Sequence, residues 1–439
     1  MKSKLSQLLL LVATITFLDS CGGSEKATDK DNIKKDSSSV KKDSTQKKEE
    51  TSDRQVPQDK KFNQIARFIA GLPQVESDEL KKYEESDAWK NYSKESEGKW
   101  KKLKEGKIAK MRAWGEQELK EPNAQGGLLF YPFSGADFLH AQTFFPNADE
   151  IVMIGLEPIG TPLDLEKVEK KQTNYFSALN KAGYFLAEFS FFRTNDMAVD
   201  LTGKRSVEVD GTIHLIMLYM AQLDNEITYY EKVAINKEGK VVLANDYKVD
   251  GDNKKVVYGN RIFFKKKGDT KVRSLTYFSV NIINMALEKE TPEFKAYLQS
   301  LRPTATYLKA ASYLMYDPLF STVKHVILKN SKFVLQDDSG MPLSNFADDS
   351  KWQKTFFGVY AGPISLFSGR YQTSMRDAYK NKDQVKALPF GIGYQFREGS
   401  SNIMLAKKVG EVTDADLETK KPVAKEDSKK EEQKTTDKK

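Results

Sequence analysis

Cysteine and histidine are both scarce in this chain of 439 residues. There is one cysteine, Cys21, and there are three histidines, His140, His214 and His325. After Cys21 the chain can therefore form no internal disulfide and no thiolate metal site, and it has no cysteine nucleophile. The three histidines are scattered and match no zinc motif such as H-E-x-x-H, so we expect neither a metal site nor a cofactor.

Aromatic residues are absent from the segment 22–60, in which Lys, Asp, Glu and Ser dominate. Such a composition cannot bury enough apolar area to offset chain entropy, so we expect 21–60 to be a disordered charged tether. The same composition returns in 411–439, which we expect to be a disordered tail. The folded body is therefore predicted to span 61–410, with residues 1–20 forming a separate signal segment.

That signal segment has a positive start, an apolar run and a cysteine immediately after it. Lys2 and Lys4 precede the run from Leu8 to Leu18, and Leu18-Asp19-Ser20-Cys21 follows. The run is short for a transmembrane helix. The pattern resembles a bacterial lipoprotein signal, although Asp19 departs from the usual motif. The resemblance implies cleavage before Cys21 and acylation of its thiol, and Gly22 in place of an aspartate favours the outer membrane.

The charge balance is moderately basic, with 70 Lys and Arg against 62 Asp and Glu. A basic surface can attract anionic lipid or polysaccharide, but an ordinary lysine-rich surface has the same composition. No basic stripe with interleaved aromatic residues is visible, so we expect no nucleic-acid partner. The expected partners are the membrane, through a lipid anchor at Cys21, and a protein or glycan of the envelope.

The body begins with a region, about 61–121, that we predict to be helical. Trp89, Trp100 and Trp114 belong to an apolar set at near-helical spacing, which predicts a face packed on a core rather than an aromatic sugar-binding platform. Apolar strands are then predicted at 128–131 and 151–154, each followed by a helix. Alternating strands and helices predict a parallel βαβ core.

Farther along, four strands are predicted to form an antiparallel meander, at 227–235, 241–249, 256–264 and 272–282. Helices are predicted over 306–316 and 319–328, and a buried strand at 334–335. The predicted fold class is α/β: a mixed sheet with a parallel βαβ core, an antiparallel extension and a helical N-terminal part.

Five short segments have sequences too particular for generic loops: 130–137 (FYPFSGAD), 155–158 (GLEP), 336–340 (QDDSG), 358–363 (GVYAGP) and 388–394 (LPFGIGY). Together they resemble an uncharacterised family of bacterial envelope and lipoprotein sequences. No activity is established for that family, so the resemblance implies no catalytic residue.

Two of these segments permit a nucleotide-site hypothesis. Gly135 lies in a turn that opens a helix after a strand, and Glu157 ends the next strand about twenty residues on. This is the layout of a Rossmann-type site, with Glu157 on a ribose. One glycine is present where the dinucleotide fingerprint has three. A methyltransferase-like fold requires fewer glycines at this turn than a dinucleotide-binding fold, so it fits the sequence better. An exported protein, however, rarely meets nucleotide cofactors.

Ser134, Asp137 and His140 suggest a hydrolase as an alternative. Asp137 and His140 would share a helix face at their three-residue spacing. Ser134 is not in a G-x-S-x-G elbow, so the usual nucleophile signature is missing. A structural role, with Ser134 capping the helix and His140 partly buried, explains the same residues.

Asp337 and Asp338 follow a predicted strand, and Glu157 ends another. If these strands are parallel neighbours, the carboxylates share one edge of the sheet, where α/β proteins place ligands. Paired carboxylates can raise one pKa and create a general acid. Alternatively, Asp337 and Asp338 stabilise the turn into Ser339-Gly340. The three carboxylates are our candidate ligand-binding residues.

The sequence as a whole predicts a lipid-anchored protein of the bacterial cell envelope that binds a ligand or partner, or has a structural role. An envelope hydrolase, or a Rossmann- or methyltransferase-like protein, is the alternative.

Overall fold

We describe a computed structural model of the chain for residues 57–73, 76–165, 172–189, 209–247 and 255–418. Residues 1–56, with Cys21 and the predicted signal, lie outside this range. Among the described residues, no helix combines the length and apolar character needed to cross a membrane.

One mixed sheet of eleven strands organises the body, in the order β10-β9-β11-β8-β7-β1-β2-β6-β5-β3-β4. Five neighbouring strands, β8, β7, β1, β2 and β6, run parallel, and antiparallel strands extend the sheet on both sides. The predicted fold class is therefore confirmed. The strands span β1 Leu128–Pro132, β2 Glu150–Gly155, β3 Asn225–Ile235, β4 Val241–Leu243, β5 Tyr258–Lys266, β6 Arg273–Ser279, β7 Ala305–Leu308, β8 Phe333–Gln336, β9 Trp352–Gly358, β10 Val385–Lys386 and β11 Asn402–Lys408.

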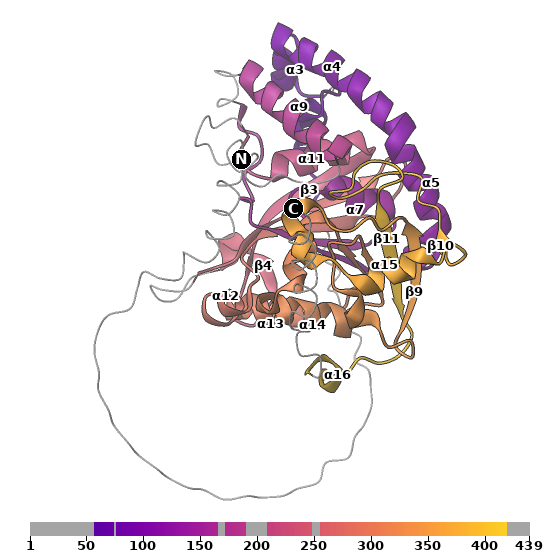
Figure 1. Cartoon of the computed structure of the whole chain (residues 1–439). Coiled ribbons are helices and arrows are strands. Elements are labelled where there is room, and N and C mark those ends of the chain that lie inside the picture. The colour runs from indigo at the N-terminus through magenta and orange to yellow at the C-terminus, as the bar shows by residue number, and fades with distance from the viewer. Residues whose placement is uncertain (1–56, 74–75, 166–171, 190–208, 248–254, 419–439) are drawn as a thin grey trace, which may run out of the picture. The chain divides into compact units, whose positions relative to one another are not determined.

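Helices cover both faces of the sheet, as Figure 1 shows. Successive residues of β1 point to opposite faces: Leu129 and Tyr131 belong to one core, and Phe130 belongs to the other. The first core is covered by α2 Lys60–Ile69, α4 Asp87–Leu103, α5 Ala109–Glu118, α7 Phe138–Phe144, α9 Gln172–Phe189 and α11 Ile213–Gln222. The second is covered by α12 Asn284–Lys289, α13 Pro292–Ser300 and α14 Ser321–Asn330.

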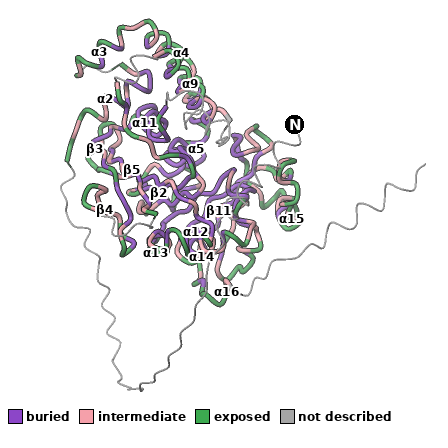
Figure 2. Tube along the Cα trace, turned by 90° about the vertical axis from the view of Figure 1, so that its left-hand side faces the viewer, coloured by how far each residue is buried: buried purple, intermediate pink, exposed green. Residues whose placement is uncertain are grey.

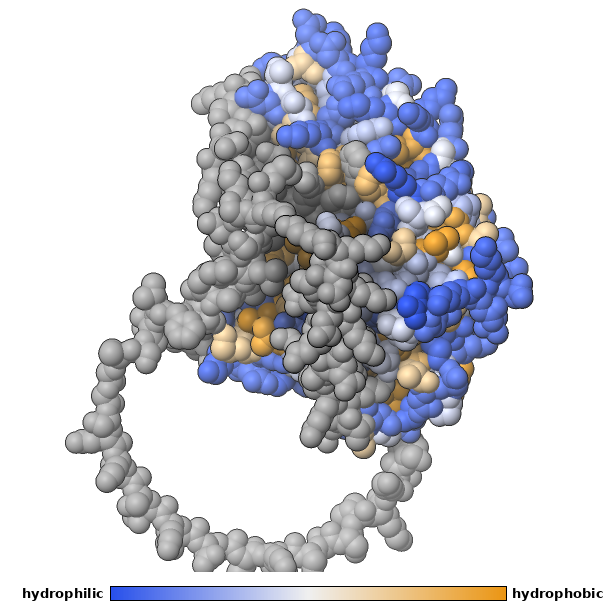
Figure 3. Space-filling model, in the orientation of Figure 1, coloured by the Kyte–Doolittle hydropathy of each residue, from blue (hydrophilic) through white to orange (hydrophobic). Residues whose placement is uncertain are grey.

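The N-terminal helices pack through the predicted apolar stripe. Trp89, Trp100 and Trp114 are all buried, so they belong to the core and form no exposed platform. In Figure 2 the outer sides of α4 and α3 (Asp78–Glu84) are exposed, and Figure 3 shows hydrophilic residues over this region. A π-helical turn, Lys104–Ile108, joins α4 to α5, and α6 Lys120–Gln125 leads into β1.

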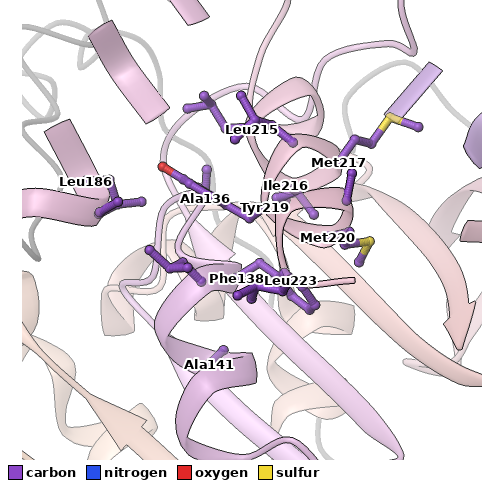
Figure 4. Close-up of a cluster of buried hydrophobic side chains, with 14 of the residues drawn as sticks. Ala136, Phe138, Ala141, Leu186, Leu215, Ile216, Met217, Tyr219, Met220 and Leu223 are labelled. Carbon is purple, nitrogen blue, oxygen red and sulfur yellow. The ribbon is translucent and has the colours of Figure 1, made fainter. Parts of the chain in front are cut away.

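Helix α11 is the most deeply buried helix of the first core. All ten of its residues are buried, which fits its almost wholly apolar sequence. Figure 4 shows its side chains Leu215, Ile216 and Tyr219 beside Ala136 and Phe138, so α11 packs directly on the loop and helix that follow β1.

Two of our predictions about elements are wrong. The segment 306–316 is not one helix: it forms the end of β7 and then a 3-10 helix, η3 Ala310–Tyr316. The four predicted strands form the two expected antiparallel hairpins, β3 with β4 and β5 with β6, but not a simple meander, because β5 pairs with β3 rather than with β4 and β6 also joins the parallel core. In addition, β11 was not predicted.

The remaining short elements lie toward the C-terminal end of the described chain: η4 Pro318–Phe320, η5 Leu343–Phe346, η6 Ser365–Arg370, α15 Thr373–Lys380 and α16 Asp414–Glu418. Helix α16 is tied to the body by Lys329–Asp414, at 2.7 Å, and by an ion pair between Lys351 and Asp416. The described body therefore continues to residue 418.

Candidate functional site

The five parallel strands end at one edge of the sheet, which we call the carboxyl edge; their opposite ends form the amino edge. In space the parallel strands run β6-β2-β1-β7-β8, which in chain order is 3-2-1-4-5. This is the order of doubly wound nucleotide-binding sheets, in which ligands bind where the strand order reverses. Here the reversal lies between β1 and β7.

The five segments singled out in the sequence meet at the carboxyl edge. Four of them directly follow β1, β2, β8 and β9. The fifth, 388–394, is held beside them because Ile392 N–H donates to Ser401 Oγ at 2.8 Å, and Val359 N–H donates to the carbonyl of Ser401 at the same distance. Segments far apart in the sequence therefore build one region.

A buried ion pair fills the reversal point. Asp137 is the N-cap of α7 and accepts from Tyr131 Oη at 2.8 Å. Lys309, directly after β7, donates from Nζ to Asp137 Oδ2 at 2.6 Å. His140 Nδ1 lies 2.7 Å from Asp137 Oδ1. Asp137 and His140 are each 1% exposed and Lys309 is 3% exposed, so the group is closed to solvent.

The charges in this group balance internally. Burial works to raise the pKa of Asp137, but His140 and Lys309 hold it well below its usual range. Burial lowers the pKa of His140 to about 4, so its imidazole is neutral at pH 7. A neutral His140 donates from Nδ1 to Asp137, which leaves Asp137 and Lys309 as a paired anion and cation.

Asp337 and Asp338 form the turn after β8, and both carboxylates reach neighbouring segments. Asp337 accepts from Ser339 N–H at 2.9 Å within its own turn, and from Ala310 N–H at 3.2 Å in η3. The Asp338 carboxylate accepts from Tyr313 Oη, and its carbonyl accepts from Tyr316 Oη at 3.1 Å. The two aspartates therefore hold η3 against the end of β8.

Burial and the neighbouring Asp338 raise the pKa of Asp337 to about 7. Burial also raises the pKa of Asp338. Gly393 lies directly against Asp337: it has φ +62°, and a Cβ added there would lie 2.0 Å from Asp337 Oδ2. A glycine is therefore required in the 388–394 segment for close approach to this carboxylate.

Glu157 does not join these carboxylates. It follows β2, which ends at the same edge as β8 but is separated from it by β1 and β7, so the two strands are not neighbours. Three strand spacings amount to about 14 Å. Glu157 is instead buried beside β6, where Tyr277 Oη donates to its carbonyl at 3.0 Å.

Ser134 also stays apart from Asp137 and His140. Its Oγ donates to the carbonyls of Gly135 and Ile154, at 3.0 and 3.2 Å, so it fastens the loop after β1 to β2. It does not cap α7, because Asp137 takes that position. Among the described residues, the Ser134 hydroxyl therefore makes no hydrogen bond to Asp137 or His140.

The loops that would cradle a nucleotide are packed on one another. A Cβ added at Gly155 would lie 3.2 Å from Gly135 Cα and 2.6 Å from Glu157 Oε2. Glu157 also faces Tyr277 rather than open space. The residues at this position therefore do not fit a bound ribose.

Lys309 is the central residue that sequence reasoning missed. The predicted helix over 306–316 includes Lys309, so the sequence pattern does not indicate that this lysine follows a parallel strand beside β1. One signal was present: between Ala305 and Phe320 the only charged residues are Lys309 and Asp317. A single lysine in an apolar stretch commonly marks a paired buried charge.

Most of the exposed large apolar side chains lie toward the carboxyl edge. Among the described residues, nine large apolar side chains are exposed, and seven of them follow strands that end at this edge. We call these seven the apolar rim: Leu156, Met285, Leu314, Leu319, Val359, Leu366 and Tyr371. The other two, Val272 and Val409, lie at the amino edge.

Side-chain contacts join the elements of the rim. Asn284 Nδ2, beside Met285, donates to the carbonyl of Pro318 in η4 at 3.0 Å. The Tyr313 ring in η3 stacks on Phe367 in η6, with centroids 4.5 Å apart. The rim is therefore supported by η3, whose position depends on Asp337 and Asp338.

Within the described ranges, no group of three or more His, Cys, Asp or Glu side chains is arranged to hold a metal ion. No protein-family model matches the chain, no curated protein matches it, and no solved structure matches it.

Proposed function

We propose that the protein is a non-catalytic, lipid-anchored protein of the bacterial cell envelope, and that it binds another envelope protein through the apolar rim. The anchor is Cys21, as its position behind the signal segment predicts. The observation that carries the binding proposal is the concentration of exposed apolar side chains at the carboxyl edge.

The rim loops are also nearly free of charge. The segments 156–163, 280–285, 310–320 and 359–371 contain three charged residues, Glu157, Asp317 and Arg370, although charged residues make up 30% of the chain. Depletion of charge, with Tyr, Phe, Met and Arg present, is the composition that distinguishes the centre of a protein–protein interface. An anionic membrane surface would favour lysine and arginine instead.

In this proposal the buried carboxylates position the rim. Asp337 and Asp338 fix η3 through its Ala310, Tyr313 and Tyr316 groups. Burial closes these carboxylates to a substrate, since Asp337 and Asp338 are 5% and 6% exposed. Exposed apolar side chains gathered at one edge, in contrast, are costly to leave uncovered and typically mark a binding site.

The test is photo-crosslinking in the bacterium that makes the protein. A photoreactive amino acid at Leu319 or Leu366 should give a discrete crosslinked protein band. The same probe at Val409, which is 52% exposed against 50% for Leu319 but lies at the amino edge, should give none.

The rim change Leu319→Asp, combined with the probe at Leu366, should remove the band. A crosslink to a second copy of this chain would identify that copy as the partner. Bands that are absent, or equally strong from Val409, would contradict the proposal.

An envelope hydrolase is the second candidate, favoured by the raised pKa of Asp337, which suits a general acid near neutral pH. In that case Asp337→Asn would abolish hydrolysis of a bound substrate. The binding proposal predicts that the rim crosslink survives this nearly isosteric change.

A further inference from the structure

A pocket at the amino edge is lined by charged and polar side chains, in contrast to the apolar rim. It lies between α5 and α6, the end of α7 and the turn from β5 to β6, and its volume is about 610 Å³. This lies within the range of small-molecule sites. The strands of the parallel core separate it from the carboxyl edge by about 17 Å, the length of a five-residue strand such as β1.

Positive side chains predominate in this pocket. Four cations line it, Arg112, Lys120, Lys266 and Lys267, against two acidic residues, Glu116 and Asp224. Within the described part of the chain, none of the four cations forms an ion pair. The neighbouring cations Lys271 and Arg273 are already paired, with Asp149 and Asp269.

The positive side chains also lie close enough together to affect one another's pKa. Partial burial, followed by the charges of Arg273 and Arg112, lowers the pKa of Lys266 below its ordinary value. Burial and Arg112 likewise act to lower the pKa of Lys104, against the opposing effect of Asp224. Arg112 therefore repels cations on two sides, and an anion placed among them would relieve that repulsion.

Neutral polar side chains complete the lining. Lys266 Nζ donates to Asn147 Oδ1 at 3.2 Å, so the ammonium is oriented by the protein. Gln142 is 6% exposed, lines the pocket and makes no side-chain hydrogen bond to another described residue. A buried amide of this kind is normally paired, so Gln142 has a donor available for a ligand.

We propose that this pocket binds a phosphate group carried by a small organic molecule, with Arg112 and Lys266 as its principal contacts. Arginine matches phosphate oxygens in pairs, and lysine adds a point charge. The pocket is larger than one phosphate ion needs. Both a soluble phosphate compound and the headgroup of a phospholipid have the required chemistry.

The experiment uses the purified full-length chain. Inorganic pyrophosphate is titrated by calorimetry, and cosedimentation is measured with vesicles of phosphatidylglycerol or of phosphatidylcholine. We expect binding to pyrophosphate or to phosphatidylglycerol, weakening as salt is raised because exposed charges are screened. Binding to pyrophosphate identifies a soluble ligand, and binding to phosphatidylglycerol alone identifies a lipid headgroup.

Arg112→Gln and Lys266→Gln should each weaken binding about tenfold, the effect of losing one charge-assisted hydrogen bond. The matched controls Lys90→Gln and Lys102→Gln remove exposed charges on α4 and should change binding less than twofold. No binding to any probe, or equal losses in the controls, would overturn the proposal. Arg112 is exposed, so its substitution should leave the fold intact.

Discussion

Asp137 and Asp337 are both buried at the carboxyl edge, yet their neighbours give them opposite charge states. Asp137 faces Lys309 and stays ionised, whereas Asp337 faces Asp338 and holds its proton up to about neutral pH. Burial alone would raise the pKa of either group. The difference arises because Asp137 lies beside a lysine at the end of β7, whereas Asp337 lies beside another aspartate in its own turn.

Asp337 should make the stability of the protein depend on pH. Its pKa is about 7 in the folded chain against 3.8 for the free group, so its ionisation opposes folding. The contribution of Asp337 to the free energy of unfolding should therefore fall by about 1.4 kcal/mol per pH unit from about pH 4 to pH 7, and no further above that. His140 and His214 act in the opposite direction between about pH 4 and 6.5, because burial lowers the pKa of each to about 4.

Asp337→Asn removes the pH dependence that is due to Asp337 and leaves the pH dependence that is due to the buried histidines. In urea unfolding we expect the variant to gain stability relative to the natural chain as pH rises from 5 to 8, by roughly 2–3 kcal/mol. The rise in stability with pH that is due to His140 and His214 should then be steeper in the variant than in the natural chain. Parallel pH profiles for the two chains would show that Asp337 is ionised throughout.

At the scale of elements, the sequence predicted the strands and helices with strong patterns. The runs at 128–131 and 151–154 form β1 and β2, because each is apolar, short and bounded by glycine or proline. Asp137 and His140 do meet, but Asp137 is the N-cap of α7 and not, as their spacing suggested, a residue on the same helix face. The pairing of Glu157 with these carboxylates, suggested as a way to raise one pKa, does not occur, and the pKa of Asp337 is raised by burial and by Asp338.

The prediction failed at β7 for a physical reason. Residues 305–316 are mostly apolar, with Lys309 as the one charged residue, and such a run does not distinguish a buried strand from a buried helix. The change from strand to 3-10 helix occurs at Ala310, which has φ +58°. The hydrogen bond from Ala310 N–H to Asp337 supports this backbone, and the partner lies 27 residues away, beyond local sequence.

This junction can be tested with two adjacent substitutions. Ala310→Gly should leave the free energy of unfolding within about 0.5 kcal/mol of the natural value, since relief at positive φ offsets the lost methyl group. Ala311→Gly, inside η3, should cost about 1 kcal/mol. Thermal or urea unfolding measures both, and a larger loss at Ala310 than at Ala311 would favour the single helix that the sequence predicted.

At the scale of the molecule, the two edges of one sheet offer different surfaces. The carboxyl edge exposes the apolar rim, and the amino edge holds the cationic pocket. Together with an anchor at Cys21 they would give the protein three separate attachments: lipid chains, a protein partner and a phosphate group. Their contributions to membrane association have different physical origins and can be separated.

Cys21→Ala should release the protein from the membrane fraction. Each buried methylene of an acyl chain contributes about 0.8 kcal/mol, so the loss of the acylated cysteine removes the strongest attachment. Ser20→Ala is the matched control, because it keeps a small residue before Cys21 and should remain membrane-bound. Fractionation in high salt suppresses the cationic pocket, and adding Leu319→Asp suppresses the rim. If Cys21→Ala still sediments with membranes under both conditions, the chain is held by something other than lipid on Cys21.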